Sequence, residues 1–331
     1  MPDAPGGREQ QLAEFLRAVQ RGDVAAVRAA LEADPSLRDA PGPHPFWGGR
    51  PNALQLAAEW GRLDVLRLLL DAGASADAQG DYDSWTPLHL ALAKGRREAA
   101  LLLLARRATL DAFAACLLDD EAALARVLRE NASRANARGP NGATPLHFAT
   151  TPGLVRALLA AGADPDARDR RGNSPGRTLA TRAAHHEAAR LLLERTGERD
   201  LWLAAALDDL TAAADLLDAD PAARDRRTTL DDCLGFYSGG APLHVAADSG
   251  SERVAALLLE RGADANARSL IGHTPLHAAA AAGQEDVASL LLLRGADIAA
   301  RDDKHHATPL DWARFQQRDD MVAWLRERGA S

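Results

Sequence analysis

The sequence predicts an all-α protein, an α-solenoid of stacked helix-turn-helix repeats with β-hairpin-like finger loops between them. The first observation behind this prediction is an opening that recurs along the chain: Thr-Pro-Leu-His at 86–89, 144–147 and 274–277, with Pro-Leu-His at 242–244 and Thr-Pro-Leu-Asp at 308–311. The second is its period, because Leu243, Leu276 and Leu310 are 33 and 34 residues apart. A unit of this size cannot bury its apolar face alone, so stacked copies are implied.

Each residue type in the best copy of the repeat has a structural role. Thr274 is placed to cap the first helix, and Pro275 occupies the first helical position, where its missing N–H costs nothing. Gly283 turns the chain into a second helix rich in leucine, and Gly295 ends that helix. The pattern therefore predicts two short antiparallel helices in each repeat.

This Thr-Pro-Leu-His-x-Ala opening with a period near 33 resembles the ankyrin repeat, over about Glu9 to Gly329. The resemblance implies about ten repeats, with a concave surface lined by the first helices and the finger loops. It also implies a protein-interaction module. A composition rich in Ala, Arg, Gly and Asp is typical of a bacterial-type member of the family.

For the domain organisation we expect a disordered N-terminus at 1–8 and a single solenoid at 9–331. The approximate repeats are 9–39, 52–77, 86–111, 111–136, 144–166, 174–197, 200–225, 241–266, 274–302 and 308–329.

Several repeats depart from the template. The repeats at 111–136 and 200–225 lack the opening, and in the shortened repeat at 144–166 Pro152-Gly153 must end the first helix early. The first, fourth and seventh repeats share a pattern of their own, whose acidic turn is Gly22-Asp23, Asp119-Asp120 and Asp208-Asp209. This recurrence predicts three larger blocks related by duplication.

Bulk composition excludes several classes of protein. A formal charge of −8 argues against a nucleic-acid or anionic-membrane binder, which would carry a basic face. Cys116 and Cys233 match no metal or redox spacing. No signal-like segment and no apolar run of membrane-spanning length is visible. We therefore expect a cytoplasmic protein.

Catalytic motifs are absent from the sequence, which contains no G-x-S-x-G, phosphate-binding glycine loop or H-E-x-x-H. We expect no catalytic residue, no metal and no cofactor, and an enzyme is the less favoured interpretation. The histidines of the repeated opening are predicted to bond the neighbouring finger loop; they are His89, His147, His244 and His277. His273, His305 and His306 lie on neighbouring loops without the spacing of a metal site.

Candidate binding residues lie in the finger loops, two of which are longer than the template. Although the chain is only 4% aromatic, these loops carry Phe46, Trp47, Tyr82, Trp85, Phe236 and Tyr237. Aromatic side chains dominate interface hot spots, which predicts apolar anchors for a partner. The alternative is that the loops fold back and their rings fill gaps between irregular repeats. For Trp85, packing on its own finger loop is favoured.

The middle finger loops are basic and carry Arg138, Arg170 and Arg171. These residues are the predicted charge partners for an acidic peptide or a small anionic ligand, and a solvated surface run is the alternative interpretation.

The function predicted from these features is binding of a partner protein or peptide through the concave face and the inserted loops. The alternative is a ligand-binding or enzymatic solenoid whose loops 40–51, 80–85 and 226–240 enclose a small-molecule pocket. Closed long loops would favour the pocket, and open loops with exposed rings would favour a protein partner.

Overall fold

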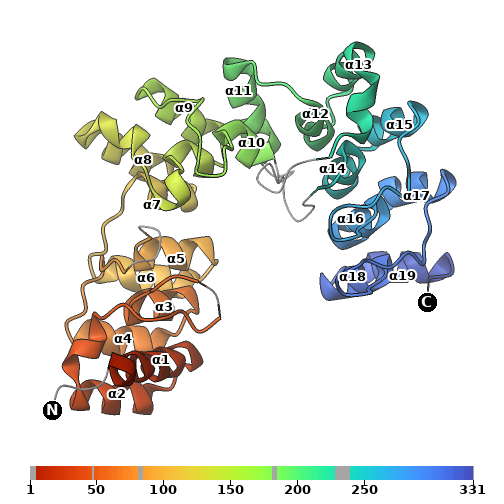
Figure 1. Ribbon diagram of the computed structural model, residues 1–331. Coiled ribbons are helices and arrows are strands. Elements are labelled where there is room, and N and C mark those ends of the chain that lie inside the picture. Colours follow the sequence, from red (N-terminus) through yellow and green to blue (C-terminus); the bar gives the residue numbers. More distant parts are fainter. Residues whose placement is uncertain (1–4, 47, 81–84, 181–184, 228–238, 331) are drawn as a thin grey trace. The chain divides into compact units, whose positions relative to one another are not determined.

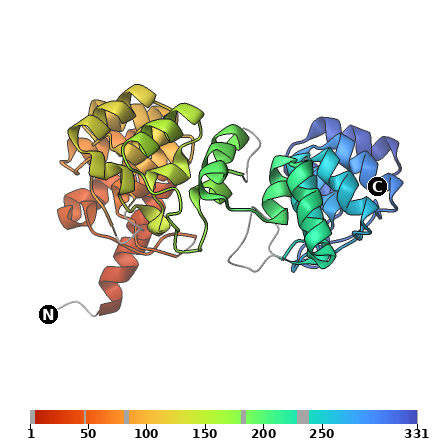
Figure 2. The ribbon, with the colours of Figure 1, turned by 90° about the horizontal axis from the view of Figure 1, so that it is seen from above.

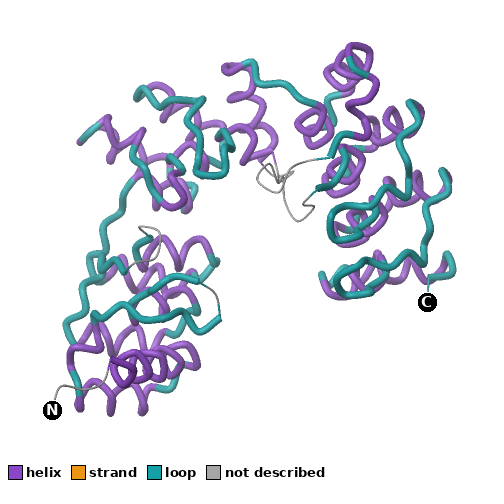
Figure 3. The backbone as a smooth tube through the Cα atoms, viewed as in Figure 1, coloured by secondary structure: helices purple, strands orange, loops and turns teal. Residues whose placement is uncertain are grey.

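The computed structural model describes residues 5–46, 48–80, 85–180, 185–227 and 239–330. These residues form helices and loops without a strand, which confirms the predicted fold class (Figure 1, Figure 3). They fall into two compact units, Met1–Asp164 and Pro165–Ser331, called here the N-terminal and the C-terminal unit.

The N-terminal unit is built of helix pairs. In chain order they are α1 (Pro5–Arg21) with α2 (Val24–Ala33), α3 (Ala53–Glu59) with α4 (Leu63–Asp71), α5 (Pro87–Ala93) with α6 (Arg97–Ala105), α7 (Ala112–Leu117) with α8 (Glu121–Glu130), and the 3-10 helix η4 (Pro145–Phe148) with α9 (Pro152–Ala160). The short 3-10 helices η1 (Pro35–Arg38), η2 (Ala132–Asn136) and η3 (Pro140–Gly142) lie between them. Consecutive first helices contact one another from α1 through α3, α5 and α7 to η4, and the second helices α2, α4 and α6 form a parallel row.

The C-terminal unit repeats this arrangement. Its pairs are α10 (Pro175–Ala180) with α11 (His186–Thr196), α12 (Leu201–Leu207) with α13 (Leu210–Ala219), α14 (Pro242–Ser249) with α15 (Glu252–Glu260), α16 (Pro275–Ala282) with α17 (Glu285–Leu293), and α18 (Pro309–Phe315) with α19 (Asp319–Glu327). The 3-10 helix η6 (Pro221–Asp225) follows α13. The first helices α10, α12, α14, α16 and α18 contact one another in that order. Figure 1 labels these helices, and Figure 2 shows the unit from above in green to blue.

The threonine of the repeated opening caps α5 and α18 as predicted, whereas at α16 the Thr274 side chain accepts no helix amide. At α5 the Thr86 hydroxyl accepts the His89 amide at 3.3 Å while the His89 ring accepts the Thr86 amide at 3.3 Å. At α16 the Thr274 hydroxyl instead lies 2.8 Å from the His277 ring. Gly283 ends α16 with φ of 81°, a left-handed conformation that favours glycine.

Some boundaries differ from the prediction. α1 begins at Pro5, so residues 5–8, which we expected to be disordered, are helical. In the shortened repeat the first helix is the single 3-10 turn η4, and Pro152 starts α9. The first helix is thus short, as expected, but it ends at Phe148, and Pro152-Gly153 begin the second helix instead of ending the first. The number of repeats, their limits and the single solenoid at 9–331 stay predictions.

The predicted block pattern has a counterpart in the second helices of the first, fourth and seventh repeats. Each of these helices, α2, α8 and α13, has 10 residues and is followed directly by a 3-10 helix. Between the two stands one extended Asp or Asn whose side chain accepts an amide two residues on, at 3.0 to 3.1 Å: Asp34, Asn131 and Asp220. After α6 the residue with positive φ is Arg107, at 64°, and after the other second helices it is a glycine such as Gly295, with φ of 84°.

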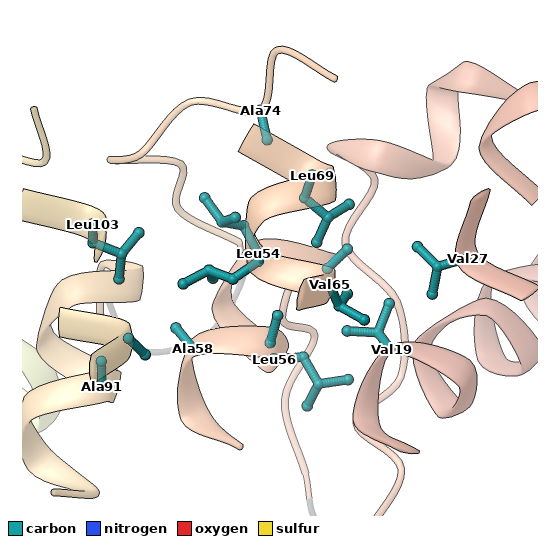
Figure 4. Packing of buried hydrophobic residues seen from close by; sticks show 14 of the residues in the cluster. Val19, Val27, Leu54, Leu56, Ala58, Val65, Leu69, Ala74, Ala91 and Leu103 are labelled. Carbon is teal, nitrogen blue, oxygen red and sulfur yellow. The ribbon is translucent and has the colours of Figure 1, made fainter. Parts of the chain in front are cut away.

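Apolar side chains from neighbouring pairs form one continuous core in the N-terminal unit (Figure 4). Leu54 of α3 lies beside Val65 and Leu69 of α4, and Leu103 of α6 extends the same core toward the next pair. Each of these side chains is essentially fully buried, which stabilises the stack by roughly 1.5–3 kcal/mol apiece. The core fixes the helices that position the candidate site.

Candidate protein-binding surface

The inserted loop at 40–51 is paired with itself and packed on the helices. The Gly42 amide donates to the Pro51 carbonyl at 3.1 Å, and the His44 amide donates to Gly49 at 3.1 Å. A Cβ on Gly42 would stand 2.8 Å from Leu16 of α1, so glycine permits this close approach. The loop base therefore lies directly against α1.

A buried polar contact holds the same loop to α3. His44 Nε2 lies 3.2 Å from Glu59 Oε2, and the two side chains are 0% and 3% exposed. His44 Nδ1 accepts the Phe46 amide at 3.2 Å, so Nε2 carries the proton and donates to the carboxylate. The loop is thereby fixed to the C-terminal end of α3.

Phe46 is presented by this anchored loop. Its side chain is 62% exposed, and its ring centroid lies 5.5 Å from that of Trp60 and 6.4 Å from that of His44. An apolar ring that stays exposed on a well-anchored backbone is suited to contact a partner.

Glu59 also faces a cation. Lys94 Nζ lies 3.6 Å from Glu59 Oε1, and the lysine side chain is 47% exposed. Glu59 and Lys94 were not predicted as site residues, and Trp60 was expected to be a core or end-cap residue. A signal was present, because Glu59-Trp60 stands where the best repeat has Ala281-Ala282.

Trp85 occupies a different cluster, in which four rings meet edge to face. Trp85 lies 5.9 Å from His89 and 6.1 Å from Phe148, and Phe113 lies 5.9 Å from both of these. The indole is half-buried and reaches from its own finger loop to η4, two repeats further along the chain. This geometry favours a packing role for Trp85.

The remaining predicted site residues are placed as follows. Trp47, Tyr82, Phe236 and Tyr237 lie outside the described residues. Arg138, Arg170 and Arg171 are exposed, and Arg138 donates to the Gly142 carbonyl of its own loop at 2.8 Å. Arg138 belongs to the N-terminal unit, and Arg170 and Arg171 belong to the C-terminal unit.

The alternative of a pocket enclosed by three loops stays a prediction. Loops 40–51 and 80–85 belong to the N-terminal unit and loop 226–240 to the C-terminal unit, and residues 81–84 and 228–238 lie outside the described residues.

The repeated histidines are structural, as predicted. His244 Nε2 lies 3.0 Å from the His273 carbonyl and His277 Nε2 lies 3.1 Å from the Ala307 carbonyl, both in the following finger loop. Burial lowers the pKa of each of these two imidazoles to about 4, so both are neutral near pH 7.

Among the described residues no group of three or more His, Cys, Asp or Glu side chains is arranged to hold a metal ion. Cys116 is buried, which raises the pKa of its thiol. In the described part of the chain, every helix is too short or too polar to cross a bilayer.

Stacked helix pairs that present finger loops define a helical-repeat scaffold. The family model for ankyrin repeats in three copies matches residues 15–114, 201–302 and 243–331, and the single ankyrin repeat model matches residues 141–170. The chain therefore belongs to the ankyrin repeat family, whose members generally bind protein partners.

Curated relatives match this chain over part of their length. The chain is 34% identical to E3 ubiquitin-protein ligase XB3 of Oryza sativa subsp. japonica over 174 residues, which are 45% of this chain and 38% of the relative. It is 37% identical to probable E3 ubiquitin-protein ligase XBOS31 of the same plant over 91 residues, 28% of this chain and 19% of the relative. It is 47% identical to protein phosphatase 1 regulatory subunit 12A of Mus musculus over 51 residues, 15% of this chain and 5% of the relative.

The chain thus spans well under half the length of these relatives. They are plant and mammalian proteins, and the bacterial type and the cytoplasmic location stay predictions.

Proposed function

We propose that this chain is a protein-interaction module that binds a partner protein or peptide through its first helices and inserted loops, with the loop at 40–51 as a principal contact. The observation that carries this proposal is the 62% exposed Phe46 ring on a loop that the buried His44–Glu59 contact holds in place. Family membership supports the general role, and the relatives support it through their shared repeats.

Anchoring matters energetically because a partner must otherwise order the loop on binding. Ordering a flexible side chain or loop costs about 0.5–1.5 kcal/mol per immobilised side chain. The hydrogen bonds within the loop and its contacts with α1 and α3 already order the loop in the free protein. Less entropy is therefore lost when a partner binds. Phe46 then contributes buried apolar area when the partner covers it.

Charge at this surface selects among partners. Lys94 lies beside Glu59 with about half of its side chain exposed, which makes it a charge-bearing neighbour of the anchored loop. Arg138, Arg170 and Arg171 are the further proposed contacts for an acidic peptide or a small anionic ligand. Trp47, Tyr82, Phe236 and Tyr237 remain proposed apolar anchors, and Trp85 remains a proposed binding residue with a packing role.

The test begins with capture of partners on the full chain, identification of the retained protein, and its purification. Its affinity is then measured by titration calorimetry for wild type, Phe46→Ala and Leu101→Ala. Leu101 is a matched control because it is an apolar side chain, 56% exposed, on the second helix α6. We expect Phe46→Ala to weaken binding at least about tenfold and Leu101→Ala to leave it unchanged.

A second variant separates the ring from its support. His44→Ala keeps Phe46 but removes the contact with Glu59, so we expect weaker binding with the ring still present. Equal affinity for wild type, Phe46→Ala and His44→Ala would reject the loop as a contact. Failure of wild type to retain any specific protein would reject the interaction function itself.

A further inference from the structure

The C-terminal unit contains a hollow between the ends of α14, α16 and α18. Its volume is about 160 Å³, and its lining includes His273, Ala281, Ala282, Trp312 and Arg318. Pockets that bind drug-sized ligands usually have volumes of roughly 300–1,000 Å³. This hollow is therefore sized for a single side chain of a larger partner.

The aromatic wall of the hollow is held in place. Trp312 Nε1 donates to the Asp302 carboxylate at 2.9 Å, and the ring centroids of Trp312 and His273 lie 4.7 Å apart, edge to face. His273 in turn stacks on His277 at 5.5 Å with 12° between the ring planes. Because burial lowers the pKa of both histidines, this wall carries no charge near pH 7.

Small side chains leave space for the hollow, and an exposed aromatic ring lies beside it. Ala281 and Ala282 are half-buried at the C-terminal end of α16, in the positions that Glu59 and Trp60 occupy in α3. Phe315 lies 5.7 Å from Trp312 and is 74% exposed. An exposed aromatic ring beside an apolar hollow is the pattern of an interaction site.

Arg318 gives the edge of the hollow a positive charge. Its Nε donates to the Ala281 carbonyl at 3.2 Å, and its stem lies against Gly283, where a Cβ would meet Arg318 Cδ at 3.5 Å. Its terminal nitrogens bind no other described residue, and the side chain is exposed. Asp248 also lines the hollow, and its backbone carbonyl accepts the Gln284 side-chain amide at 3.3 Å. A carboxylate of a bound peptide is therefore favoured on the Arg318 side.

We propose that this hollow binds a short peptide segment of a partner protein, with one apolar side chain of the peptide packed on Trp312 and Phe315 and an adjacent carboxylate paired with Arg318. An arginine guanidinium pairs with a carboxylate through two parallel hydrogen bonds, which gives direction as well as attraction. The inference rests on the proposed function, because both take the partner to be a protein. The site lies in the C-terminal unit, whereas Phe46 belongs to the N-terminal unit.

The probe is a phage-displayed library of random heptapeptides, selected on the full chain. We expect enriched peptides in which a large apolar residue lies within one or two positions of Asp or Glu. One such peptide, made synthetically with a fluorophore, is then titrated by fluorescence anisotropy against wild type and variants. Ala282→Leu fills the hollow and Arg318→Gln removes the charge, so each should weaken binding at least about tenfold.

The structure offers a matched control for Arg318→Gln. Arg62 has the same role in the N-terminal unit, because its Nε donates to the Gln20 carbonyl at 2.6 Å and its stem lies against Gly22. Arg62→Gln should bind the peptide as wild type does. Ala282→Ser, which stays small, should also keep binding and shows that a change at this position does not itself unfold the chain.

Enriched peptides without an acid, no enrichment at all, or equal binding by Ala282→Leu and wild type would each overturn this proposal. The selected peptide could also lose its affinity for Phe46→Ala and keep it for Ala282→Leu. That result would overturn the proposed peptide site, while the proposed function would stand. The partner capture described above decides that function separately.

Discussion

His89 Nε2 lies 2.9 Å from the carboxylate of Asp111, the residue that also caps α7 by accepting the Ala114 amide at 2.9 Å. In the regular repeats the histidine at this position bonds a backbone carbonyl of the next finger loop, as His277 bonds Ala307. α6 ends at Ala105 and α7 begins at Ala112, which leaves no room for a finger loop. Asp111 supplies the missing acceptor from its side chain.

The seventh repeat is joined to its predecessor in the same way. Arg177 stands where the opening has histidine, and it forms an ion pair with Asp200, which caps α12 by accepting the Leu203 amide at 2.8 Å. A hydrogen-bonding side chain therefore meets the capping aspartate at both places where a repeat lacks the opening. This shared contact between repeats supports the inference that the blocks arose by duplication.

The first prediction tests the His89–Asp111 contact. Asp111→Ala removes both a helix cap, worth about 1 kcal/mol, and the acceptor of a buried imidazole, worth about 1–3 kcal/mol. We expect a loss of about 2–4 kcal/mol in the free energy of unfolding, measured by urea denaturation at pH 7. Asp111→Asn keeps the cap and an acceptor oxygen, so it should cost less than about 1 kcal/mol. Equal losses for the two variants would contradict this account.

The regular part of the fold could be predicted because its signals are local. Thr86, Pro87 and Gly283 each act within a few residues of their own position, so their roles follow from residue type and spacing. The recurring acidic turn likewise predicted the block pattern, since Asp23, Asp120 and Asp209 cap helices that begin beside them.

The candidate site was less accessible to prediction because its contacts join distant parts of the chain. That the loop carrying Phe46 differs from the template was visible in the sequence. Its attachment depends on a contact between the His44 ring and the Glu59 carboxylate, 15 residues further along the chain. Trp85 contacts Phe148 of the short helix η4, and the sequence alone does not specify that contact.

The second prediction concerns pH. Burial lowers the pKa of His244 and His277 to about 4, whereas an unfolded histidine titrates near about 6.5. Between these values the unfolded chain holds protons that the folded chain lacks, so stability falls as pH drops through this window and is fully present above it. Each residue contributes at most roughly 3 kcal/mol.

The measurement is urea denaturation of wild type and His277→Gln at intervals from pH 7.5 to pH 4.5. The variant should lose stability less steeply with falling pH, by about one proton in slope, even if it is less stable at pH 7.5. Asp302 does not obscure the comparison, because its pKa of about 2 places its contribution at lower pH. Identical slopes for the two proteins would refute the assignment.

The third prediction separates packing from surface roles among the aromatic residues. Trp85→Ala removes a half-buried ring that contacts His89 and Phe148, so we expect a loss of about 2–3 kcal/mol. Phe46→Ala removes a ring that is 62% exposed, and its cost should stay below about 1 kcal/mol. Thermal and urea unfolding of the two variants measures both. A Trp85→Ala protein as stable as wild type would mean that the indole is a free surface anchor.

The fourth prediction uses two glycines with nearly the same backbone. Gly272 has φ of 78° and Gly295 has φ of 84°, so alanine at either position meets the left-handed penalty of about 1–2 kcal/mol. Nothing lies within 4 Å of a Cβ on Gly295, whereas one on Gly272 would stand 2.6 Å from the backbone nitrogen of Asp303. That nitrogen donates to the Ile271 carbonyl at 3.0 Å and joins two finger loops.

A shift of Asp303 would break this bond between loops, and backbone cannot move aside as the end of a flexible side chain can. We therefore expect Gly272→Ala to lower the free energy of unfolding by roughly 2 kcal/mol more than Gly295→Ala, since a strained backbone and the lost hydrogen bond between the loops are added to the left-handed penalty. Paired urea denaturations under one set of conditions provide the comparison. Equal losses in the free energy of unfolding for the two variants would show that the finger loops rearrange around the added methyl group at no cost. The loop edge beside the Trp312 hollow would then not be a rigid support for a bound peptide.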